Sequence, residues 1–104
     1  MAILHDAYRI IGTQNVAFAA AGGASAASNA FGSQTYWILV SAVGLYAAGS
    51  GIRIAIGDGT PTASATSTLV PVNFPMVFAV TPGQKVACLS NDATTGSLSV
   101  TELS

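Results

Sequence analysis

The stretch VACLSNDATTGSLSVTEL, residues 86–103, decides the fold. It holds two runs of alternating apolar and small polar residues, joined by the turn-forming segment SNDATTG. In a strand, such alternation sends successive side chains to opposite faces. We therefore expect Leu98 and Val100 to point inward, with Ser97, Ser99 and Thr101 toward water or a neighbour. The turn residues predict that the two strands form a closing hairpin.

Two further runs have the composition of strands. TYWILVSAV, residues 35–43, is apolar on both faces, which is typical of a central strand covered twice. GIRIAIG, residues 51–57, places Ile52, Ile54 and Ile56 on one face. The glycine-rich segment between the two runs predicts that they pair as antiparallel neighbours.

The segment NFPMVFAVTPGQKVACLS, residues 73–90, predicts another pair of strands around a turn. Met76 and Phe78 share one face before the turn. Pro82 followed by Gly83 favours a type II turn, because the glycine readily takes positive φ. The segment that precedes this pair, DGTPTASATSTLVP (residues 58–71), predicts a polar connection over the surface.

The first third of the chain is less regular. AYRIIG (7–12) and VAFAA (16–20) are two short candidate strands, and the TQN between them suits a turn. The small-residue segment AGGASAASNAFGS (21–33) is expected to be a loop, because Gly22 and Gly23 disfavour a helix.

Seven or eight short runs at this spacing predict an all-β fold, a single antiparallel β-sandwich that is jelly-roll or Greek-key-like. The 104 residues suit one domain, 1–104. Within it, we expect residues 1–33 to form an N-terminal arm with the first strands and to make intersubunit contacts, and residues 34–104 to form the sandwich core.

Charge is scarce: 7% of residues are charged, against about 25% in an ordinary soluble protein. This composition favours a subunit that hides neutral surface against other copies or partners. The net charge is -1, and the three basic residues are dispersed, so we expect no nucleic-acid partner. The longest apolar run is interrupted by Ser41 and Gly44 and falls short of the about 20 residues of a spanning helix, so we expect no membrane association.

The residues for catalysis are also scarce. Cys88 is the single cysteine and reads as a buried apolar residue, and His5 is the single histidine. The four acidic residues lie near a chain end or in predicted turns, and no G-x-S-x-G motif accompanies the serines. We therefore expect no enzyme activity, no cofactor, no metal site and no small-molecule substrate.

From about residue 33 to residue 104, a succession of segments carries a resemblance: YWILVSAVG, GIRIAIGDGTPTASATSTLVP, FAVTPGQKVACLS and GSLSVTEL. It resembles small virion proteins of tailed bacteriophages, especially capsid decoration (cement) and head-fibre-like proteins. The resemblance implies a compact β-sandwich on the outside of an icosahedral shell, without catalytic residues. It also implies the major capsid protein and copies of the chain itself, as a dimer or trimer, as partners. The implied location is the virion capsid surface, after assembly in the host cytoplasm.

Interfaces are enriched in aromatic residues and arginine, which identifies candidate contact residues. These are Tyr8, Arg9, Phe18, Phe31, Tyr36, Tyr46 and Phe74. Trp37 and Phe78 are instead expected to fill the core. Two alternatives remain: a tail or other repeating virion subunit, and a carbohydrate-binding β-sandwich module that uses Trp37 or Tyr46 as a stacking platform.

Overall fold

The computed structural model describes residues 8–44 and 51–104, and these residues form eight strands without a helix. The strands are β1 (Ile10–Phe18), β2 (Ala26–Ala27), β3 (Trp37–Gly44), β4 (Gly51–Gly57), β5 (Thr68–Pro71), β6 (Met76–Ala79), β7 (Lys85–Ser90) and β8 (Gly96–Leu103). The predicted all-β sandwich of short strands is confirmed. Neither described range contains a helix of the length and apolarity that crossing a bilayer requires.

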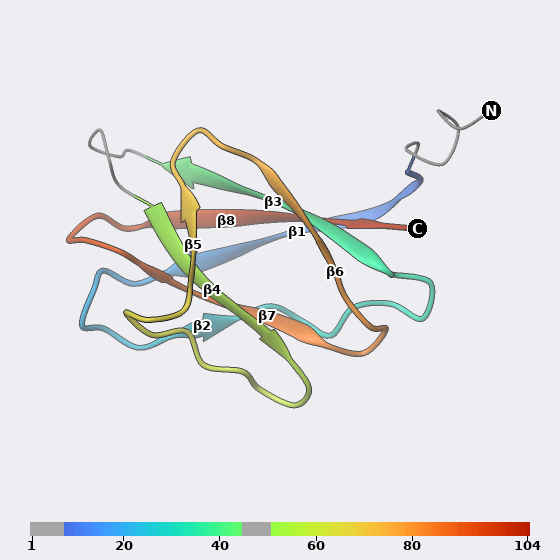
Figure 1. Cartoon of the computed structure of the whole chain (residues 1–104), viewed down its shortest axis with the longest axis horizontal. Coiled ribbons are helices and arrows are strands. Elements are labelled where there is room, and N and C mark those ends of the chain that lie inside the picture. Colours follow the sequence, from blue (N-terminus) through green and yellow to red (C-terminus); the bar gives the residue numbers. More distant parts are fainter. Residues whose placement is uncertain (1–7, 45–50) are drawn as a thin grey trace.

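The strands form two four-stranded antiparallel sheets that pack face to face (Figure 1). One sheet has the order β1-β8-β3-β6 and is named here the β8 sheet. The other has the order β2-β7-β4-β5 and is named the β7 sheet. The first strand therefore pairs with the last, the second with the seventh, the third with the sixth and the fourth with the fifth. This nested pairing is the jelly-roll arrangement.

The pairing of successive strands differs from the prediction. β7 and β8 do not form a hairpin, because β7 lies in one sheet and β8 in the other. The same is true of β6 with β7 and of β3 with β4. Turn residues end a strand, but they do not determine which layer the next strand joins. In this fold most turns carry the chain from one sheet to the other.

The predicted alternation of side chains is confirmed at the core. Leu98 and Val100 of β8 are fully buried, and Ile52 and Ile54 of β4 meet them from the opposite sheet. Ile56, Met76 and Phe78 pack against this cluster. Each fully buried side chain of this size contributes about 1.5–3 kcal/mol. One shared core therefore holds the two sheets together.

The N-terminal third is part of the sandwich, which differs from the expected arm. β1 continues through the predicted TQN turn and pairs with β8 from Ile10↔Leu103 to Phe18↔Gly96, with an irregularity between Ile10 and Gly12. Val16 and Phe18 lie in the core cluster. Thr13 and Asn15 occupy outward positions of the strand, so their polarity requires no turn. The sandwich core thus begins before residue 34.

The connection between β6 and β7 has the predicted type II turn. Gly83 has a φ of 88°, and the Gln84 amide donates to the Thr81 carbonyl at 3.1 Å. Pro82 precedes the glycine, as that turn favours.

The connection between β4 and β5, residues 58–67, lies against the outer face of the β7 sheet. Its Ala63 is buried against Ala87 and Leu89, with Ala19 and Ala27 packed around them. This small second cluster covers the outer side of the sheet with the chain's own residues.

Candidate interaction surface

Among the described residues, the outward positions of β1, β8, β3 and β6 hold no charged side chain. The register places its outward residues in four rows across the strands: Ile10, Leu103, Trp37 and Ala79; Thr13, Thr101, Leu39 and Val77; Asn15, Ser99 and Ser41; Ala17, Ser97 and Val43. We name this surface the bare face. Its residues are apolar or small and uncharged.

Large apolar side chains on the bare face are exposed to water. Ile10 is 70% exposed, Val43 53% and Val77 45%. These three residues lie in different rows, with Ile10 and Val77 on the two edge strands, so they surround a centre of serine, threonine and asparagine and do not form one contiguous apolar patch. At one end of the face Leu103 is only 5% exposed and the ring of Tyr8 packs against Trp37, whereas the residues of the other three rows are partly or largely exposed.

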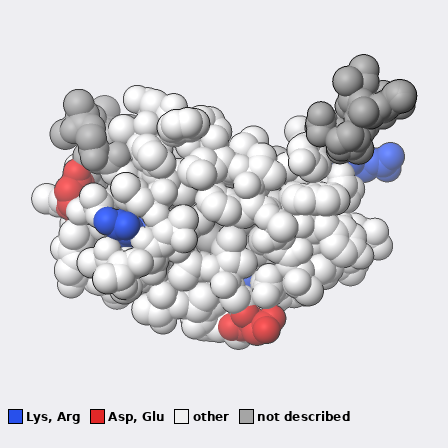
Figure 2. Space-filling view, viewed as in Figure 1, with Lys and Arg blue, Asp and Glu red and all other residues white. Residues whose placement is uncertain are grey.

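The outer face of the β7 sheet is different. Its outward residues include Arg53 and Lys85, and residues 58–67 cover part of it. The Arg53 guanidinium donates to Asn91 Oδ1 and to the Ser67 carbonyl, each at 2.9 Å. In the view of Figure 2 the charged side chains are few and lie at the left, at the lower edge and at the right, with wide uncharged areas between these places.

Three aromatic rings meet at one end of the bare face. The centroids of Tyr8 and Trp37 are 5.4 Å apart with the rings tilted by 58°, and those of Tyr36 and Trp37 are 6.2 Å apart in an edge contact. Tyr8 is 43% exposed and Tyr36 48%. We name these three residues the aromatic cluster.

The end of β8 positions the aromatic cluster. On one side, Arg9 and Ser104 exchange two backbone hydrogen bonds of 2.9 Å, which fixes the chain next to Tyr8. On the other side, the Tyr36 amide donates to the Leu103 carbonyl at 3.1 Å. The rings therefore project from two segments held against the same strand.

Arg9 pairs with Ser104 through its backbone. The structure brings together the rings of two of the predicted contact residues, Tyr8 and Tyr36. Trp37 joins them, which corrects the expectation that it fills the core. It lies on the outward side of β3 and is only partly buried, because Ile38 and Val40 take the inward positions. Phe78, by contrast, packs against the core as expected.

The other predicted contact residues lie elsewhere. Phe18 and Phe31 are buried in the core of their own chain and are not presented to a partner. Phe74 is 63% exposed in the connection between β5 and β6, away from the aromatic cluster. Tyr46 lies outside the described residues.

Sequence reasoning missed Ile10, Val43 and Val77 as contact candidates. Their alternation with core residues shows that they face outward, but not that this outer face is uncovered. Which of the two outer faces is covered depends on residues 58–67, and these residues lie against the β7 sheet. No local signal in the sequence indicates which sheet the connection covers.

The titratable side chains have structural contacts. The Cys88 thiol is fully buried, and burial raises its pKa from 9.0 to about 12. Glu102 Oε1 accepts hydrogen bonds from the Gly32 amide and the Thr35 hydroxyl, both at 2.8 Å. Within residues 8–44 and 51–104, no group of three or more His, Cys, Asp or Glu side chains is placed to hold a metal ion.

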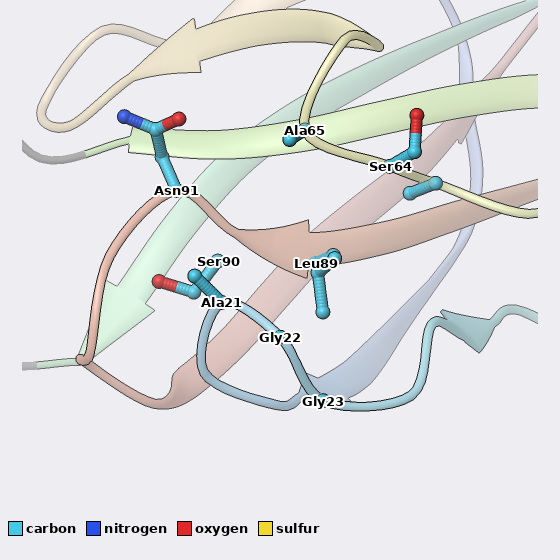
Figure 3. A pocket seen from close by; sticks show the side chains of 9 residues that line it. Ala21, Gly22, Gly23, Ser64, Ala65, Leu89, Ser90 and Asn91 are labelled. Carbon is cyan, nitrogen blue, oxygen red and sulfur yellow. The ribbon is translucent and has the colours of Figure 1, made fainter.

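A pocket of about 310 Å³ lies between residues 21–23, residues 63–65 and the end of β7 (Figure 3). Small residues line it around Leu89. Its polar side chains are already engaged within the chain: Ser90 Oγ lies 3.3 Å from Asp92 Oδ1, and Asn91 Oδ1 accepts from Arg53. The pocket therefore offers shape and methyl groups but neither a charged nor an aromatic lining residue.

No protein-family model matches the chain, and no curated protein or solved structure matches it either.

Proposed function

We propose that the chain is a non-enzymatic virion structural protein that decorates and stabilises a bacteriophage capsid by binding the outer shell lattice. Its partner in this role is the major capsid protein. The observation that carries the proposal is the partly exposed aromatic cluster at the end of the β8 sheet.

The composition of this end is that of a binding hot spot. Tryptophan, tyrosine and arginine are the residues that most often dominate the binding energy of protein interfaces. Tyr8 and Tyr36 are each partly exposed, and their ring contacts with Trp37 hold them in place before binding. Residues that are already ordered lose less conformational entropy when a partner arrives.

The chemistry of the described residues supports a non-enzymatic role. The nucleophilic candidate, Cys88, is buried, and its raised pKa keeps the thiol protonated at neutral pH. The carboxylates of Glu102 and Asp92 hold loops by accepting backbone hydrogen bonds. The jelly roll occurs in viral capsid proteins, lectins and cupins, so the fold agrees with the proposal without selecting it.

The location is tested on particles purified from the phage whose genome encodes the chain. Mass spectrometry should detect the chain in those particles. Electron cryomicroscopy should show a density of its size at repeated positions over the shell. Density along the tail would instead favour the alternative of a tail subunit, and absence from the particles would overturn the proposal.

The contact is tested with shells that lack the chain. We expect Trp37→Ala to weaken binding by at least about 2 kcal/mol, the typical loss for a hot-spot residue. Phe74→Ala is the matched control, because Phe74 is an exposed aromatic residue away from the cluster. Equal binding by both variants and the unmodified chain would contradict the proposed contact.

The partial exposure of Trp37 favours one second candidate, a carbohydrate-binding module. The rings of the aromatic cluster are inclined by 58° and 65°, so they provide no coplanar platform for a sugar ring. A glycan array separates the two functions, since binding that Trp37→Ala abolishes would favour the carbohydrate-binding module.

A further inference from the structure

We propose that the bare face is covered by a second copy of this chain, with the same face presented by both subunits. The inference goes beyond capsid binding, because the contact between copies is centred on Ser99, and the aromatic cluster that the proposed function assigns to the capsid lies at the end of the face, outside that contact. The inference rests on three properties of the bare face: its lack of charge, its area and the small side chains at its centre.

The absence of charge on this face suits a contact between identical surfaces. In a two-fold contact the same patch lies on both sides, so a charged residue near the axis would face its own copy. Juxtaposed like charges cost several kcal/mol. None of the outward residues of β1, β8, β3 and β6 is charged, whereas Arg53 and Lys85 face outward from the β7 sheet. The bare face therefore meets its copy without repulsion.

The extent of the face is near the lower limit for a specific contact. At about 4.8 Å between strands and about 3.4 Å per residue, three strands of about eight residues and the four-residue β6 give a flat area of roughly 450 Å². Two copies would together bury about 900 Å², just below the about 1,000 Å² that a specific protein interface should exceed. The relief of the side chains and the flanking exposed Ile11 add to this area.

The centre of the face permits close approach. Ser99 lies beside Asn15 on one neighbouring strand and Ser41 on the other, with Ser97 and Thr101 next along β8. Small side chains let two sheets pack at about 10 Å, and their hydroxyls can form hydrogen bonds across the contact. Ile10, Val43 and Val77 surround this centre and would lose their exposure to water.

The two sheets also differ in how their outer faces are covered. The chain covers part of the β7 sheet with its own residues 58–67, through Ala63. The described residues leave the β8 sheet uncovered, although it carries the more exposed apolar side chains. A second copy supplies this missing cover without introducing a charge.

The test is the mass in solution of the full chain, measured by light scattering coupled to size exclusion over a range of concentrations. We expect a dimer. Ser99→Lys places a charge at the centre of the face and should weaken association by at least about tenfold. Thr66→Lys is the matched control, because it adds the same charge at an exposed position of residues 58–67 and should leave the dimer intact. Circular dichroism checks that both variants retain the β fold.

A mixing experiment tests whether the same face is used on both subunits. We expect Ser99→Lys and Ser99→Glu chains to be mainly monomeric alone and to associate when mixed. A monomeric unmodified chain at all concentrations, or unchanged association of Ser99→Lys, would overturn the inference. A monomer that still binds shells through Trp37 would overturn it while leaving the proposed function intact.

Discussion

At the scale of single residues, identical side chains have different energetic roles depending on the face they occupy. Ile38 on β3 is fully buried between the sheets, whereas Ile10 on β1 is 70% exposed on the bare face. Truncation of a buried isoleucine removes its transfer free energy and leaves a cavity, while truncation of an exposed one does neither. The two positions therefore separate stability from association.

We predict that Ile38→Ala lowers the free energy of unfolding by about 2–5 kcal/mol. Ile10→Ala is the control, and its effect on the monomer should stay within about 0.5 kcal/mol. Urea denaturation at low protein concentration measures both. Similar losses for the two variants would show that the assignment of inner and outer faces is wrong.

Cys88 gives stability a dependence on alkaline pH. Its pKa is raised from 9.0 to about 12 by burial, so the folded chain keeps the thiol proton at pH values where the unfolded chain releases it. Above pH 9.0 the release of this proton stabilises the unfolded chain. The free energy of unfolding therefore falls as the pH rises from 9.0 to about 12. We expect Cys88→Ala to have a flatter stability profile than the unmodified chain in denaturation series across this window. Parallel profiles would contradict this prediction.

At the scale of elements, β1 is the strand whose role the sequence least reveals. It is paired with β8 along its length, and Val16 and Phe18 contribute to the core. Gln14 also joins it to the loop before β3: its side-chain Oε1 accepts from the Asn29 amide at 2.9 Å. β1 is thus integral to the sandwich.

We predict that deletion of residues 1–33 abolishes the fold, because it removes β1, β2 and three buried side chains of the core, Val16, Phe18 and Phe31. Circular dichroism and the loss of a cooperative thermal transition would show this. Deletion of residues 2–7 is the control, since every described strand remains. A shortened chain of residues 34–104 that still unfolds cooperatively would contradict the role given to β1.

The sequence predicts where the strands lie and which side chains face inward better than it predicts which strands pair. The inward positions of Ile52, Ile54, Leu98 and Val100 follow from alternation, which is a property of each strand by itself. The pairing of β8 with β1 and β3 depends on contacts between distant segments, which turn residues do not encode. Burial statistics favour the core for Trp37, and its strand is apolar on both faces, so only the strand order shows that Trp37 faces outward.

At the scale of the whole molecule, the two outer faces are unequal. One is partly covered by the chain and carries basic residues, and the other is uncovered and uncharged. Of the candidate site, the sequence predicts Tyr8 and Tyr36 and the general scarcity of charge. It did not predict that uncharged residues gather on one sheet, because this depends on the strand order.

We predict that association of the chain withstands salt. The bare face carries no charged side chain, so screening, which shortens the Debye length from about 10 Å at 0.1 M to about 3 Å at 1 M salt, removes no attraction from it. The dissociation constant measured by sedimentation should stay constant or decrease over that range. Dissociation at 1 M salt would show that ion pairs hold the subunits together and that another surface is used.

The central place of β8 in its sheet has a consequence for the order of events during translation. β8 is the last strand in chain order, and both of its neighbours, β1 and β3, pair with it. Until the ribosome has made residues 96–103, β1 has no strand to pair with in its sheet and remains unpaired. Completion of the core therefore follows synthesis of residues 96–103, and in a nascent chain stalled before them the unpaired β1 should be sensitive to proteases.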